Sequence, residues 1–186
     1  MLKLQKQDFT ATNIIIAFTV LMYIIQINIP QGSFLFGLNI YFLVGQLYWQ
    51  PLSTIFAHGG IAHLGMNMFV LWQFGTMIER FIGAKRFVLL YFITGIITSI
   101  LSFLYIFYVD MGVNLVGASG AICALLGFFA YFEKSQRSGV ITWILLISVA
   151  PLLLGLPIAW YAHFIGLAVG FIYAIIYKQL FFLRRW

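Results

Sequence analysis

The chain contains a serine within a turn of small residues, Gly117-Ala118-Ser119-Gly120, at the start of a long apolar segment. It contains three histidines in all: His58, His63 and His163. A serine hydroxyl is a weak nucleophile until a neighbouring histidine accepts its proton. Nucleophilic catalysis by Ser119 and one of the histidines is therefore the first chemistry to consider.

Composition determines the environment in which that chemistry would occur. Of the 186 residues, 63% are hydrophobic and 8% are charged, and the mean hydropathy is +1.05. A soluble domain has roughly 45–50% apolar and about 25% charged residues, so the sequence predicts an integral membrane protein. The single cysteine, Cys123, excludes an internal disulfide framework.

Long apolar segments predict six membrane spans, at residues 12–29, 57–78, 87–109, 117–132, 140–155 and 158–177. Residues 30–50 are uncharged and aromatic, but prolines and glycines interrupt them, so we expect an interfacial first loop there. The first apolar run is too long for the core of a signal peptide and is expected to remain as the first span.

The basic residues all fall on one side of this six-span arrangement. They lie in the two termini and in two loops: Lys3, Lys6, Arg80, Lys85, Arg86, Lys134, Arg137, Lys178, Arg184 and Arg185. Cytoplasmic segments carry the excess of lysine and arginine. The predicted topology therefore has both termini inside, and the net charge of +6 indicates membrane topology and not nucleic-acid binding.

Several polar residues are predicted to lie at a similar depth in the membrane. Ser119, His163, His63 and Asn67 come twelve to sixteen residues before the charged residue that ends each span. At about 1.5 Å per residue, they lie roughly 18–24 Å above the inner interface. Residues 111–116 would re-enter the membrane before Ser119, which implies a water-filled cavity open to the outer side.

These residues also have simpler explanations. Ser119, Cys123 and Gly127 form a small-residue stripe of the kind that packs helices, and a lone serine in a membrane helix is more often a packing residue. His63 and Asn67, one helical turn apart, could make interhelical hydrogen bonds. Ionisable residues inside membranes are nevertheless functional candidates, and the shared depth favours a common site.

Other chemistries lack the residues they need. The sequence has no His-Glu-x-x-His pattern for zinc, and none of its four acidic residues is predicted at mid-membrane depth. A three-histidine metal site is disfavoured because His58 is expected about a turn and a half above His63, near the outer end of the same helix. Cys123 is disfavoured as a nucleophile because it lies a turn below Ser119. We therefore expect no metal and no cofactor.

Four motifs occur in order along the chain: His58 followed by His63-x-x-x-Asn67, Gly75-x-x-x-Glu79-x-x-x-Gly83, Gly117-Ala118-Ser119-Gly120, and Ala162-His163-x-x-Gly166-x-x-x-Gly170. Together they resemble the motifs of rhomboid intramembrane serine proteases of the compact six-span bacterial type. The resemblance runs from about Trp49 to Gly170. It implies an all-α membrane protein, with a six-transmembrane-helix rhomboid-like bundle forming a single domain over residues 1–186.

The resemblance also implies roles for individual residues. Ser119 would attack the scissile carbonyl and His163 would accept its proton, without an acidic third member. Oxyanion and substrate stabilisation would come from His63, Asn67 and the turn at Gly117 and Ala118, including the backbone N–H of Ser119. The expected supporting residues are His58, Gly120, Cys123, Gly166 and Gly170.

Three positions depart from the family pattern. One is Arg80, which directly follows Glu79 where the frequent pattern places the arginine one residue later. Cys123 stands where some bacterial members carry a tyrosine that packs against the catalytic histidine, which leaves open how His163 is held; a neighbouring helix could do it. Gln50 follows Trp49 where the family often has arginine, which weakens any inference about lipid contacts in the first loop.

The predicted function is an intramembrane serine endopeptidase that cleaves transmembrane protein substrates near their outer boundary. Its surroundings would be membrane lipid, its location the bacterial inner membrane, and no nucleic-acid partner is expected. Residues 151–157 are a candidate substrate gate. One alternative is a non-catalytic rhomboid-like protein that binds or escorts membrane helices, and the presence of both Ser119 and His163 disfavours it. The other is a small transporter or channel, which the lack of buried acidic groups and of inverted repeats disfavours.

Overall fold

A computed structural model describes residues 10–155 and 158–181 of the chain. Its elements are helical: α1 (Ala11–Asn28), α2 (Gly32–Phe36), α3 (Tyr41–Val44), α4 (Gln50–Ser53), α5 (Ile61–Val70), η1 (Leu71–Gly75), α6 (Thr76–Ile82), α7 (Ala84–Tyr108), α8 (Ser119–Phe132), η2 (Lys134–Gln136), α9 (Arg137–Leu153) and α10 (Trp160–Phe181). The residues outside the described part include Lys3, Lys6, Arg184, Arg185 and positions 156–157 of the predicted gate.

Four helices of the described part are long and apolar enough to cross a membrane, namely α1, α7, the 20-residue segment Lys134–Leu153 that contains α9, and α10. The helix α8 is apolar but has only 14 residues. The second predicted span is built from three consecutive pieces, α5, the π-helical η1 and α6. These lengths and compositions are those of an integral membrane protein.

Glycines set two helix starts that differ from the predicted ones. The second span was predicted to begin at residue 57, but α5 begins at Ile61, after Gly60 adopts an extended conformation with φ of 166°. The prediction that His58 lies within this helix was therefore wrong, because it lies in the loop before it. Gly117 has a φ of 131°, which excludes it from a right-handed helix, and α8 accordingly begins at Ser119 and not at residue 117.

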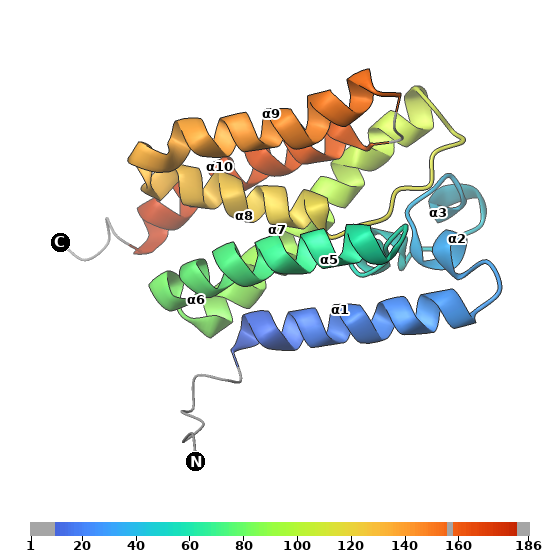
Figure 1. Cartoon of the computed structure of the whole chain (residues 1–186), viewed down its shortest axis with the longest axis horizontal. Helices are drawn as coiled ribbons and strands as arrows, with labels where there is room; N and C mark the ends of the chain where they lie inside the picture. Colours follow the sequence, from blue (N-terminus) through green and yellow to red (C-terminus); the bar gives the residue numbers. More distant parts are fainter. Residues whose placement is uncertain (1–9, 156–157, 182–186) are drawn as a thin grey trace, which may run out of the picture.

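At the centre of the bundle lies α8, nine of whose 14 residues are buried. Figure 1 shows it surrounded by α5, α7, α9 and α10. The start of α1, the helix α6, the junction between α8 and α9 and the end of α10 lie together at one end of the bundle. The short helices α2 and α3 lie at the opposite end, so the expected first loop contains helical turns.

Buried polar contacts hold the two ends of α1, one against α6 and the other against the loop before α5. The Glu79 carboxylate accepts hydrogen bonds from the backbone N–H groups of Ala11 (2.8 Å) and Thr12 (2.9 Å) and from the Thr12 hydroxyl (2.7 Å). At the other end, Gln26 donates to the carbonyl of His58 (2.8 Å) and accepts from its N–H (2.9 Å). These contacts fix the loop that carries His58 relative to the rest of the bundle.

Candidate active site

Ser119 and His163 meet between the first turn of α8 and the first turns of α10. The Ser119 Oγ atom lies 3.0 Å from Nε2 of His163, which is hydrogen-bonding distance. The serine is half-buried, and the histidine is 6% exposed. A hydroxyl and an imidazole in this geometry can exchange a proton, as a nucleophile and a general base must.

The short distance between the two side chains depends on the close packing of α8 and α10. A Cβ atom at Gly170 would overlap the carbonyl oxygen of Ala124, and one at Gly166 would overlap that of Gly120. A Cβ at Gly166 would also come within 3.1 Å of Cβ of Cys123. Glycines are therefore required at these two positions of α10 for the helices to approach this closely.

The turn before Ser119 is fixed by hydrogen bonds to the first loop. The Gly117 N–H donates to the carbonyl of Thr54 (3.0 Å), and the Thr54 hydroxyl donates to the carbonyl of Leu115 (2.6 Å). Leu115 also exchanges two backbone hydrogen bonds of 2.8 Å each with Leu38, in the isolated β-bridge. Ala118, at the end of the turn, is fully buried. The positive-φ conformation of Gly117 is thus held by contacts on both sides.

The imidazole of His63 faces this turn from α5. A Cβ at Gly117 would lie 2.8 Å from Cε1 and 3.0 Å from Nε2 of His63, and 3.6 Å from Oγ of Ser119. The N–H of Gly59 donates to Nδ1 of His63 (3.4 Å), so in neutral His63 the proton resides on Nε2. A proton donor is therefore present on the side of the ring that faces the turn.

Asn67 lies one helical turn further along α5. It is 7% exposed, and its Nδ2 atom is buried with no hydrogen-bond partner among the described residues. A buried amide without a partner is costly unless a ligand or water supplies one. The Asn67 amide is thus a second hydrogen-bond donor, after His63, that a bound group could use.

His58 lies beside His63. Its Nδ1 donates to the carbonyl of Phe56 (3.1 Å), and its ring lies 5.1 Å from the His63 ring, at 64° between planes. This contact puts His58 in a position to support the His63 ring. Separately, among the described residues no group of three or more His, Cys, Asp or Glu side chains could hold a metal ion.

Ser148 of α9 is a site residue that sequence reasoning missed. Its Oγ atom lies 2.9 Å from Nδ1 of His163, on the opposite side of the imidazole from Ser119. The neighbouring helix that could hold His163 in the absence of a large residue at Cys123 is therefore α9. The sequence signals it weakly, because Ser148 is one of two hydroxyl residues, with Thr142, in the otherwise apolar predicted fifth span.

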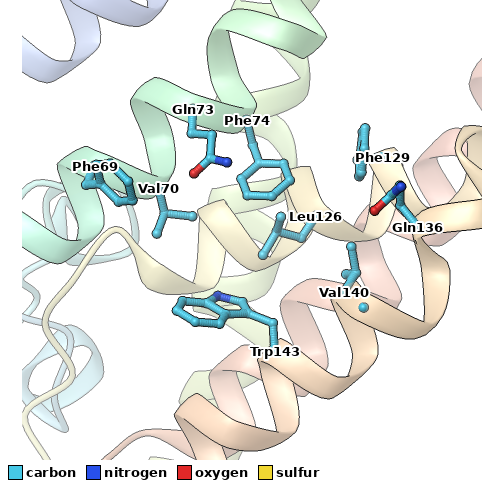
Figure 2. A pocket seen from close by; sticks show the side chains of 10 residues that line it. Phe69, Val70, Gln73, Phe74, Leu126, Phe129, Gln136, Val140 and Trp143 are labelled. Carbon is cyan, nitrogen blue, oxygen red and sulfur yellow. The ribbon is translucent and has the colours of Figure 1, made fainter.

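A groove of about 350 Å³ opens between η1 and α9, and the α8 residues that line it, Leu126 and Phe129, come after Ser119 along that helix. Figure 2 shows its walls of aromatic and aliphatic side chains with two amides, and its lining residues are Phe69, Val70, Gln73, Phe74, Leu126, Phe129, Gln136, Gly139, Val140 and Trp143. Neither Ser119 nor His163 is among them. The groove is an apolar opening between two helices on one side of α8.

Comparison with known proteins yields one family match and several relatives. Residues 45–180 match the family model of the Rhomboid domain. The chain is 38% identical over 135 residues to the rhomboid protease GluP of Bacillus subtilis (strain 168), an alignment that covers 69% of this chain and 25% of that protein. It is 31% identical over 141 residues to the putative rhomboid protease YdcA of the same strain, covering 71% of this chain and 68% of that protein.

A plant protein is also similar. RHOMBOID-like protein 4 of Arabidopsis thaliana is 37% identical over 134 residues, covering 67% of this chain and 32% of that protein. The chain therefore matches about a quarter of GluP and a third of RHOMBOID-like protein 4.

Proposed function

This chain belongs to the rhomboid family, and on that premise we propose that it is an intramembrane serine endopeptidase that cleaves membrane-spanning segments of other proteins. Ser119 is the nucleophile and His163 the general base. The observation that carries the proposal is the 3.0 Å distance between Ser119 Oγ and His163 Nε2 at the start of the central helix α8. The similarity to GluP, which is called a rhomboid protease, supports the same activity.

The first half of the reaction forms an acyl-enzyme. As Ser119 Oγ bonds to the scissile carbonyl carbon, its proton moves to Nε2 of His163, and the carbonyl π electrons become an oxyanion. The tetrahedral intermediate then collapses, and the C–N bond breaks. The His163 imidazolium gives its proton to the departing amine, which leaves the substrate acyl group as an ester on Ser119.

The oxyanion is stabilised by donors at the mouth of α8. His63 would donate through the proton on its Nε2, Asn67 through its amide, which has no partner among the described residues, and Ser119 through its backbone N–H. The positive end of the α8 dipole adds to them. Removal of one such donor typically lowers the rate by about 10²–10³-fold.

The second half of the reaction needs water. A cavity open to the outer side supplies a water molecule, whose proton goes to Nε2 of His163 while its oxygen attacks the ester carbon. His163 then returns that proton to Ser119 Oγ as the acid product leaves. Irregular backbone at membrane depth, such as the segment before α8, requires protein or water around it, which supports a wet cavity.

The proposed topology has six spans, with both termini on the cytoplasmic side of the bacterial inner membrane. It is supported by the grouping of the helix ends in Figure 1, where the start of α1 and the end of α10 lie at the same end of the bundle. Basic residues of the described part, such as Arg80, Lys134 and Lys178, belong to that end. In this topology the whole chain forms one membrane domain.

Substrate helices enter sideways, beside α9. Three of the 17 residues of α9 are buried, compared with ten of the 25 residues of α7. The groove between η1 and α9 offers an apolar surface next to this helix (Figure 2). The end of α9 around Pro151 and Gly155 would act as the gate.

The experiment is cleavage of a model transmembrane substrate by the purified chain in detergent, together with labelling by a serine-reactive fluorophosphonate. We expect wild-type protein to cleave and to be labelled, and Ser119→Ala to do neither while keeping its thermal unfolding temperature. The control is Ser102→Ala, which removes another buried hydroxyl, on α7. Cleavage by Ser119→Ala would refute the dyad, and wild-type protein that binds the substrate without cleaving it would indicate a helix-binding protein instead.

A further inference from the structure

A second serine contacts the imidazole of His163 from the side opposite Ser119. The Ser148 Oγ lies 2.9 Å from Nδ1, and the Ser119 Oγ lies 3.0 Å from Nε2. The three side chains therefore form one chain of hydrogen bonds across α9, α10 and α8. Both nitrogens of His163 are occupied by hydroxyl groups.

Such a chain has two possible directions, and only one is productive. If Nδ1 carries the proton, it donates to Ser148, and the lone pair on Nε2 is free to accept the proton of Ser119. If Ser148 donates to Nδ1 instead, the proton resides on Nε2, and His163 cannot act as the base. A partner that accepts from Nδ1 also stabilises the imidazolium that forms during the reaction.

Packing fixes Ser148 at this position. The buried residues of α9 are Val140, Ile144 and Ser148, which follow each other at intervals of one helical turn and form a single inward-facing stripe. Ser148 has 0% exposure, so a water molecule from bulk solvent does not replace it readily. The three carboxylates of the described residues lie elsewhere: Glu79 within α6, bonded to the start of α1, Asp110 in the loop after α7, and Glu133 at the end of α8.

We propose that Ser148 is a positioning residue: its Oγ accepts a hydrogen bond from Nδ1–H of His163, and in that orientation it favours the tautomer in which Nε2 can deprotonate Ser119. This inference rests on the proposed proteolytic function. In this role the hydroxyl of a gate-side helix takes the place that a carboxylate occupies in soluble serine proteases. The base is then complete only while α9 is packed against α10.

The test compares Ser148→Thr with Ser148→Val in the full-length chain. These two side chains have nearly the same shape and differ in the hydroxyl, so a purely structural role would affect both equally. We expect Ser148→Thr to keep kcat within about threefold of wild type, and Ser148→Val to lower kcat by about 10–100-fold, the range for loss of one hydrogen bond to an ionised group. KM for the transmembrane substrate should stay the same in both.

A spectroscopic readout separates positioning from packing. In protein labelled with ¹⁵N-histidine, the His163 signals should report a proton on Nδ1 in wild type and in Ser148→Thr, and a shifted tautomer balance in Ser148→Val. Equal kcat values for the two variants, or an unchanged tautomer signal, would overturn the positioning role. Failure of the proposed function would look different, because wild-type protein itself would then not cleave or would cleave without Ser119.

Discussion

Replacement of Gly170 by alanine should slow cleavage strongly, although this residue is not part of the dyad. This glycine lies seven residues after His163 on α10 and contacts the backbone of Ala124 on α8. A Cβ at this position would lie 2.7 Å from Cα of Ala124 and closer still to its carbonyl oxygen. The substitution therefore pushes backbone against backbone, and no side-chain rotation can relieve the overlap.

The size of the effect follows from these distances. Ordinary contact begins at 3.4 Å, so α10 must retreat from α8 by about 0.7 Å or more. The Ser119–His163 distance of 3.0 Å would then approach about 3.7 Å, which is beyond a hydrogen bond. A misplacement of about 1 Å typically costs about 10²-fold in rate, and overpacking of this kind costs about 1–3 kcal/mol in stability.

The assay is single-turnover cleavage of a transmembrane substrate, with the thermal unfolding temperature measured on the same samples. Gly65→Ala is the matched control, because a Cβ there meets nothing within 4 Å and the residue lies on the exposed face of α5. We expect Gly65→Ala to cleave normally and Gly170→Ala to cleave about 10²-fold more slowly. A normal rate in folded Gly170→Ala would refute the argument that α8–α10 contact sets the dyad distance.

Three further predictions concern polar groups. Asn67→Ala should lower kcat by about 10²–10³-fold with little loss of stability, because Nδ2 has no partner among the described residues; comparison of cleavage rates with unfolding temperatures checks this, and a normal rate would exclude Asn67 from the oxyanion site. Glu79→Gln should destabilise the fold by about 1–3 kcal/mol, since an amide has one acceptor oxygen for three donors, while the rate per labelled active site stays unchanged. Gln26→Leu should leave the N–H and carbonyl of His58 buried and unpaired, and should lower the unfolding temperature more than Asn28→Leu, a replacement at an exposed position of the same helix.

The contact between Ser119 and His163 could be predicted because the charged residue at the end of each helix gives a reference point. The number of residues back from Glu133 and from Lys178 places both side chains at one depth, and the glycines at 166 and 170 predict a close helix contact. The spacing of His63 and Asn67 likewise predicts one helical face. Properties that depend on periodicity and length within one helix are accessible from the sequence.

Properties that depend on how two helices are rotated against each other were not accessible. Ser148 contacts His163 because of the angle at which α9 faces α10, and the mostly apolar sequence of α9 does not show which of its faces turns inward. The start of α5 was also misplaced, because Gly59 and Gly60 can belong to a helix or interrupt it and the tertiary contact between Gln26 and His58 decides. The π-helical turn of η1 has no signal in its five residues.

The order of the helices along the chain has a consequence for biosynthesis. Chains are made from the N-terminus, so Ser119, His63 and Asn67 are synthesised before His163, which lies 44 residues after Ser119. A nascent chain with α8 already in the membrane would hold a serine without its base. The proposed proteolytic activity would thus begin only when α10 docks against α8. The dyad would be incomplete while the chain is still being synthesised and inserted into the membrane.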